Sequence, residues 1–304
     1  MSRTPRKKGL SNIHHIMSRS ISELQLFVDF KDKDKFLNII RKYQKIYMFT
    51  IYSFVLMDTH YHLQVNDNGA DISKFMKSIN QSYAQYYNKK YSRHGHLFSD
   101  RFKSKPIEKD SYVVTASAYI HNNPEDIPNY KNRVHKYKYS SLKVYAGMPS
   151  KYSDILDVDF ILKYFNTNKR LARKSYLDFV CKFTDLKIKD ELEFNSSESF
   201  YTPMKHILVR NFKPTDIIDF VSHYNKESFC IHAKYNHKNI ESKSICVVLM
   251  RSLCDFKFSD ISKTIGNLTY SNIGRLCEKG ISLINTSEKY RNIVDDFINY
   301  SSSA

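Results

Sequence analysis

The amino-acid sequence predicts an α+β protein: a ferredoxin-like antiparallel sheet with helices, followed by an all-α region that contains a helix-turn-helix. Two observations carry this prediction. In the first half, strand and helix signals follow one another in the order β-α-β-β-α-β, with a further helix, which is the order of a ferredoxin-like sandwich. In the last third, apolar residues recur at helical spacing, and the breaks between them have helix-turn-helix lengths.

The elements of the first half can be placed in order along the chain. Strands are expected at residues 13–18, 49–57, 60–65 and 101–107, and helices at 32–47, 71–91 and 110–123. Asp58 and Thr59 form the turn between the second and third strands. We expect Asp110 to cap the third helix, and Pro124 to end it, because the residue before a proline avoids helical backbone angles.

The second half is predicted to contain a polar linker followed by helices. We expect a first domain at 1–150, a helical extension and linker at 151–199, and a helical domain at 200–304. Helices at 242–254, 259–265 and 269–284, with a turn at 266–268, have helix-turn-helix spacing. A small helical bundle of another kind fits this pattern equally well.

Composition indicates a polyanionic partner. The chain has 304 residues, with 48 Lys and Arg against 31 Asp and Glu, a formal net charge of +17. Such an excess favours nucleic acid, although the abundance of Lys, Asn, Ile and Tyr is also typical of proteins from AT-rich genomes. The five cysteines include no C-x-x-C pair, which indicates reduced thiols and a cytoplasmic protein. No apolar segment approaches the length of a membrane span, so no membrane partner is expected.

Two histidines that follow the turn between strands suggest a metal site. His60 and His62 lie two residues apart on a predicted strand, so both imidazoles point to one face of the sheet. His94 and His96 have the same spacing but flank a glycine in a predicted loop. We interpret this second pair as structural or close to a phosphate, and not as metal-binding.

A tyrosine near the end of the third helix suggests nucleophilic chemistry. Tyr119 and Asn123 are four residues apart on a helix and therefore neighbours on one face. A tyrosine hydroxyl ordinarily titrates near pH 10, so it needs a nearby cation to act as a nucleophile. The Asn123 carbonyl oxygen, with the two imidazoles, would suit Mg²⁺ or Mn²⁺.

These motifs resemble those of a known family. Five stretches match it in order and spacing, at residues 13–19, 54–63, 91–104, 119–124 and 137–141. Through them the first half resembles the HUH single-tyrosine transposases, specifically the REP-associated branch with a transposase IS200-like domain. Asp58-Thr59 departs from the Pro-Asn of many relatives, and Ser20 lies near the position of a glycine that is common in the family.

The resemblance implies an HUH endonuclease fold that cleaves single-stranded DNA, often beside a hairpin, and leaves a 5′-phosphotyrosine and a free 3′-hydroxyl. By position, His60 and His62 would be the metal ligands, Asn123 the third ligand and Tyr119 the nucleophile. The ion would be Mg²⁺ or Mn²⁺. Basic residues in the motif expected beside the site would hold DNA phosphates: Arg93, Arg101, Lys103 and Lys105.

The last third resembles, more weakly, the helix-turn-helix of the DNA-binding domain of the replication initiator DnaA. The likeness rests on residues 260–266 and 271–273. It implies that Asn272 and Arg275 lie on a recognition helix. The basic, His-containing recognition loop of DnaA is not evident, so recognition of its specific DNA sequence is not implied.

Three functions remain open from the sequence. The leading one is a transposase or a domesticated hairpin processor that forms a covalent intermediate with single-stranded or hairpin DNA. The second is a DNA-binding regulator that keeps the fold without cutting. The third is a metal-dependent phosphohydrolase that uses water and would not need Tyr119. The sequence leaves open whether the chain forms a homodimer.

Overall fold

The computed structural model describes residues 12–22, 24–183, 210–233, 239–266 and 268–302. They divide into two compact units. The first is formed by the described parts of 1–41, 49–68 and 72–206, and the second by those of 42–48, 69–71 and 207–304. The linker predicted within 187–199 lies outside the described residues, so the predicted domain boundaries stay predictions.

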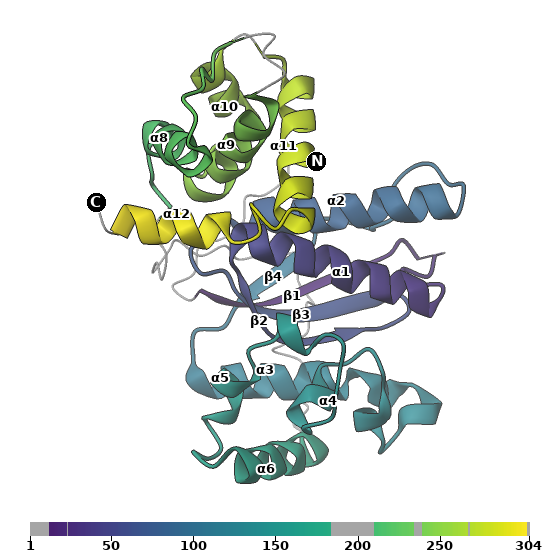
Figure 1. Cartoon of the computed structure of the whole chain (residues 1–304). Coiled ribbons are helices and arrows are strands. Elements are labelled where there is room, and N and C mark those ends of the chain that lie inside the picture. The colour runs from purple at the N-terminus through teal and green to yellow at the C-terminus, as the bar shows by residue number, and fades with distance from the viewer. Residues whose placement is uncertain (1–11, 23, 184–209, 234–238, 267, 303–304) are drawn as a thin grey trace. The chain divides into compact units, whose positions relative to one another are not determined.

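A four-stranded antiparallel sheet runs through the middle of the first unit (Figure 1). Its strands, in the order β2-β3-β1-β4, are β1 (Ile13–Arg19), β2 (Thr50–Leu56), β3 (His60–Asn66) and β4 (Lys103–Pro106). This strand order and the β-α-β-β-α-β sequence of elements are those of a ferredoxin-like sandwich. The predicted fold class is therefore confirmed.

Helices cover both faces of this sheet (Figure 1). Helices α1 (Phe30–Tyr47) and α2 (Ile72–Lys90) lie on one face, and α3 (Asp110–Asn122) lies on the other. Helices α4 (Leu142–Tyr145), α5 (Val158–Leu162) and α6 (Lys169–Lys182) pack around α3. The 3₁₀ turn η1 (Asn123–Asp126) follows α3 directly. Asp110 lies in the first turn of α3 and does not cap it: the capping position is Lys109, without a side-chain bond, so that expectation was wrong.

Side chains along β3 point alternately to the two faces of the sheet. Tyr61 is buried on the α1 and α2 side, where its ring lies 4.7 Å from that of Phe36 and its hydroxyl donates to Asn80 at 2.8 Å. Gln64 points the other way and donates to the carbonyl of Val113 in α3 at 2.8 Å. Residues at even positions of β3 therefore face α3.

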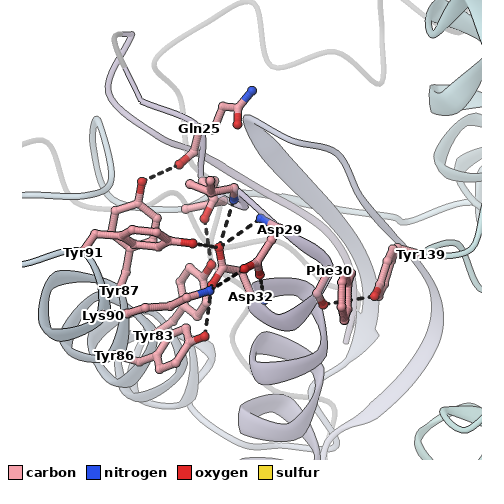
Figure 2. Close-up of polar contacts among 12 residues, drawn as sticks. Gln25, Asp29, Phe30, Asp32, Tyr83, Tyr86, Tyr87, Lys90, Tyr91 and Tyr139 are labelled. Carbon is pink, nitrogen blue, oxygen red and sulfur yellow. Dashed lines mark hydrogen bonds and ion pairs between the residues drawn. The ribbon is translucent and has the colours of Figure 1, made fainter.

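A buried carboxylate fixes the start of α1 (Figure 2). Asp32 is fully buried and accepts hydrogen bonds from the Tyr91 hydroxyl at 2.7 Å, the Tyr86 hydroxyl at 3.0 Å and the Lys90 ammonium at 2.7 Å. It also accepts from the backbone amides of Val28 and Asp29. One side chain thus ties the segment before α1 to the end of α2.

The second unit is all-helical, as predicted for the last third. Its helices are α8 (Pro214–Asn225), α9 (Ile240–Leu253), α10 (Phe258–Ile265), α11 (Tyr270–Thr286) and α12 (Ile293–Ser302). Helices α9 and α11 pack closely at Gly280, where an added Cβ would lie 2.3 Å from the carbonyl oxygen of Ser244. The hydroxyl of Thr269 caps α11 by accepting from the amide of Asn272. In neither unit is a described helix long and apolar enough to cross a membrane.

Removing the Asp32 carboxylate should destabilise the protein strongly. In Asp32→Ala, Lys90 and two tyrosines lose a common acceptor, which is expected to lower the free energy of unfolding by about 3 kcal/mol. Asp159→Ala is a matched control, because the Asp159 carboxylate pairs with Lys169 at the surface and should contribute less than about 1 kcal/mol. Urea unfolding of both variants measures the difference, and equal losses would contradict this reading.

Candidate active site

An open pocket of about 520 Å³ lies in the first unit, where β1 and β3 meet the end of α3. Strands β1, β3 and β4, helix α3 and the 3₁₀ turn η1 contribute residues to it. Its lining includes Arg19, His60, His62, Lys103, Tyr119 and Asn123. The four residues predicted to carry the chemistry therefore come together in one pocket, although they lie in two segments about sixty residues apart in the sequence.

The rings of the site meet edge to face. The His60 and His62 imidazoles have centroids 5.2 Å apart and nearly perpendicular planes, at 89°. The Tyr119 ring lies 5.7 Å from that of His62, at 88°. Both imidazoles thus stand on the α3 side of the sheet, beside the tyrosine.

A third histidine, which the sequence analysis did not select, supports this arrangement. His15 of β1 is fully buried, and its Nε2 lies 2.9 Å from Nδ1 of His62. Its ring stacks on that of His62 at 5.1 Å and meets the Tyr119 ring at 5.6 Å. His15 therefore fixes the orientation of His62 and contacts the tyrosine as well.

The histidine nitrogens suit a metal ligand set. Nδ1 of His62 is engaged with His15, and Nδ1 of His60 lies 3.0 Å from the hydroxyl of Thr59. At metal sites a supporting group commonly holds the second ring nitrogen of a ligating histidine and so fixes the orientation of its imidazole. No described group of three or more His, Cys, Asp or Glu side chains is arranged to hold a metal. The two histidines and the amide Asn123 nevertheless line one pocket.

Burial keeps both candidate ligands neutral. It lowers the pKa of His62 well below its ordinary value, and the neighbouring His15 and His60 lower it further. Burial also lowers the pKa of His60, against a hydrogen bond with Asn123 that raises it. Neutral imidazole is the form that coordinates metal ions, so these shifts favour ligation over protonation.

Helix α3 is anchored by a buried polar network next to the site. His121 lies fully buried between the Tyr176 hydroxyl of α6 and the Ser141 hydroxyl, each 2.6 Å from one ring nitrogen. Ser141 in turn accepts from the amide of Phe54 in β2 at 2.8 Å. The network joins α3 to the sheet and to α6, so the positions of Tyr119 and Asn123 relative to β3 are held.

The predicted DNA-binding residues are only partly brought to the pocket. Lys103 lines it, and Lys105 lies two residues along β4, opposite His15 in the β1–β4 register. Arg93 and Arg101 lie outside the lining residues. Asn272 and Arg275 are exposed on α11 of the second unit, so their predicted role stays untested.

Two charged residues of the pocket were missed by the sequence analysis. Arg19 lies at the end of β1, opposite His60 in the β1–β3 register, and Asp126 ends the turn after α3. Arg19 is part of the first matching stretch, and the antiparallel pairing of that stretch with β3 is the signal that would have selected it. Asp126 has no such signal, because its approach depends on the turn at Pro124.

Part of the chain is similar to known proteins. Residues 10–123 match the family described as "Transposase IS200 like". A solved structure described as a REP-associated tyrosine transposase bound to a REP hairpin is 16% identical, over 52% of this chain and 90% of its own, with a TM-score of 0.40. No curated protein matches this chain.

The His121 network should make stability depend on pH. Burial lowers the pKa of His121 to about 3, whereas an unfolded histidine titrates near 6.5. Between these values the unfolded chain binds a proton that the folded one does not, so stability falls as the pH falls from about 6.5 towards 3, by up to about 1.4 kcal/mol per pH unit. In His121→Gln this contribution disappears.

Urea unfolding at pH 7, 6, 5 and 4 measures this effect. The stability advantage of the wild type over His121→Gln should shrink as the pH falls below about 6.5. Tyr176→Phe is the control, because it removes a hydroxyl of the same network and keeps the titrating ring. A gap between wild type and His121→Gln that stays constant with pH would show that His121 is not kept neutral by burial.

Proposed function

We propose that the protein is a tyrosine transposase or a domesticated processor of DNA hairpins, because its residues 10–123 match the IS200-like transposase family. It would be a metal-dependent single-strand DNA endonuclease and transesterase. The observation that carries the proposal is the pocket in which Tyr119 meets His60, His62 and Asn123.

The proposed nucleophile is the Tyr119 hydroxyl. It attacks the scissile phosphorus and forms a new P–O bond, while the bond to the 3′ oxygen of the preceding nucleotide breaks. The tyrosine hydroxyl loses its proton, and the departing oxygen gains one to become a 3′-hydroxyl. The energy of the phosphodiester is kept in the 5′-phosphotyrosine, so a second hydroxyl can later reverse the step and join strands.

We propose that His60, His62 and Asn123 hold Mg²⁺ or Mn²⁺. When bound, the ion would polarise the phosphoryl oxygen and favour the ionised tyrosine. His15 orients His62 through the hydrogen bond at its Nδ1. Arg19 and Lys103 line the same pocket and would hold the DNA backbone on either side of the reacting phosphate.

The second unit is proposed to bind a duplex or hairpin stem. Helices α10 and α11 have helix-turn-helix spacing, and Asn272 and Arg275 are exposed near the start of α11, where recognition helices contact bases. This role extends the proposal beyond the residues that match the family.

The runner-up function, a regulator that binds DNA without cutting, is supported less well. It would require no nucleophile, yet Tyr119 lines the pocket beside both histidines. A phosphohydrolase that uses water would likewise have no need of the tyrosine. The test of the proposal is therefore a test of Tyr119.

Tyr119→Phe should abolish covalent adduct formation and leave DNA binding within about twofold, because only the attacking hydroxyl is lost. The assay incubates the full chain with single-stranded hairpin DNA and Mn²⁺ and detects the adduct on a denaturing gel. Tyr112→Phe is the matched control on the same helix and should still form the adduct. A DNA-linked peptide that contains Tyr112 but not Tyr119, found by mass spectrometry, would overturn the assignment.

His60→Ala and His62→Ala should each weaken Mn²⁺ binding at least about tenfold, because each removes a direct ligand. Asn123→Ala should be milder, since water can replace one oxygen ligand. Titration of the DNA-free protein with Mn²⁺, followed by electron paramagnetic resonance, measures the effect without relying on activity. His96→Ala is the control at an exposed histidine outside the pocket, and an equal loss there would remove the assignment.

A further inference from the structure

A second pocket of the first unit has a different chemistry. It measures about 350 Å³ and lies between the start of α1 and the segment that follows η1. Its lining includes the carboxylates of Asp29 and Asp58 and several aromatic side chains: Phe27, Phe30, Tyr130, Tyr137 and Tyr139. Phe30 is 57% exposed, although it is a large apolar side chain, and its neighbour Val28 is 48% exposed.

Positive charge lies against these rings. The Lys138 ammonium is 5.5 Å from the centroid of the Phe30 ring and 5.1 Å from that of Tyr139. Lys138 makes no ion pair with any described residue. Lys33, by contrast, is buried and paired with Asp58 at 2.7 Å. Of the two lysines that line this pocket, Lys138 is therefore the one that can pair with an anionic partner.

The exposed ring stands on rigid backbone. The carbonyl of Phe30 accepts from the Tyr139 hydroxyl at 3.0 Å, and the residues before it are held by the buried Asp32 carboxylate (Figure 2). Tyr137 is fixed by donating to the carbonyl of Leu56 at 2.6 Å. The pocket is thus formed before any ligand arrives, which lowers the entropy lost on binding.

The aromatic pocket lies next to the candidate active site, because at two places consecutive residues of the chain line one pocket and then the other. Asp58 lines the aromatic pocket and the next residue, Thr59, lines the active-site pocket. Likewise, Asp126 lines the active-site pocket and Ile127 the aromatic one. A DNA strand with its scissile phosphate at Tyr119 would therefore pass directly beside the aromatic pocket.

We propose that the aromatic pocket holds an unpaired base of single-stranded DNA close to the cleaved phosphate, with the base stacked on Phe30 and an adjacent phosphate near Lys138. The inference rests on the proposed function, because it extends the path of the same strand. Stacking on aromatic rings beside a cation is how proteins hold single strands without reading a particular base. A base inside a duplex is already stacked on its neighbours, so this subsite selects an unpaired nucleotide.

The test compares two DNA probes that differ only in their bases. One is the twelve-nucleotide oligomer (dT)12, and the other is a base-free chain of the same length with the same phosphates. Affinities are measured by fluorescence anisotropy on the full chain in EDTA, which prevents cleavage. Phe30→Ala should lower the affinity for (dT)12 by about 5- to 150-fold, the range expected for one stacked base. Its affinity for the base-free chain should change by less than about twofold.

Three further variants sharpen the result. Phe30→Trp should keep the affinity for (dT)12, because it keeps a stacking surface. Lys138→Ala should weaken both probes to a similar degree, because a phosphate contact ignores the base. Tyr164→Ala is the matched control: its aromatic ring is 45% exposed in the same unit, outside both pockets, and neither affinity should change.

Several outcomes would overturn the proposal. If Phe30→Ala weakens both probes equally, or weakens neither, the pocket holds no base. If the wild type binds neither probe and forms no adduct with hairpin DNA, the proposed function fails along with it. If the wild type forms the adduct while Phe30→Ala changes nothing, only the subsite is wrong. Self-association that is lost in Phe30→Ala, with unchanged DNA affinity, would assign the surface to a second copy of the chain.

Discussion

The arrangement of the first unit depends on the alternation of side chains along β3. This strand is hydrogen-bonded on both sides, to β2 and to β1. Tyr61, Leu63 and Val65 are buried, and a shift of the register by one residue would send them to the opposite face and His62 into the core beneath α1 and α2. The apolar side chains that fill that core therefore also determine that the two histidines face α3.

Helix α3 satisfies a packing requirement and a chemical one at the same time. Val113 and Ala116 are buried in a core shared with α5 and α6, whereas Tyr119 is only partly buried and lines the pocket. Because His121 is bonded to groups on two other elements, the helix cannot slide along the sheet without breaking a buried network. Tyr119, the nucleophile we propose, would need this restraint, since small misplacements of a reacting group reduce rate strongly.

The two pockets are kept in place by different interactions on either side of the turn at Asp58 and Thr59. On one side, the pair of His15 and His62 holds the active-site pocket. On the other, the Asp32 carboxylate and the Tyr139 hydroxyl hold the start of α1, from which Phe30 projects. Rigid support beneath both pockets is consistent with a protein that fixes a flexible single strand against a preformed surface.

The sequence by itself determined the order of the elements, the fold class and the identity of the central residues of the pocket. Apolar periodicity was sufficient to predict the order of the elements. The two-residue spacing of His60 and His62 was sufficient to place both on one face of the sheet. The association of Tyr119 with them came from the resemblance to a family, since local spacing contains no information about contacts between distant segments.

Only the tertiary structure decided what surrounds these residues. The register of β1 against β3 brings Arg19 opposite His60, and the packing of α3 on the sheet brings Tyr119 against His15 and His62. The aromatic pocket has the same origin, because Phe30 and Lys138 are more than a hundred residues apart and meet through the end of one helix and a loop. Short-range patterns report which face a side chain occupies, whereas contacts between segments depend on how whole elements pack, and that is a property of the complete core.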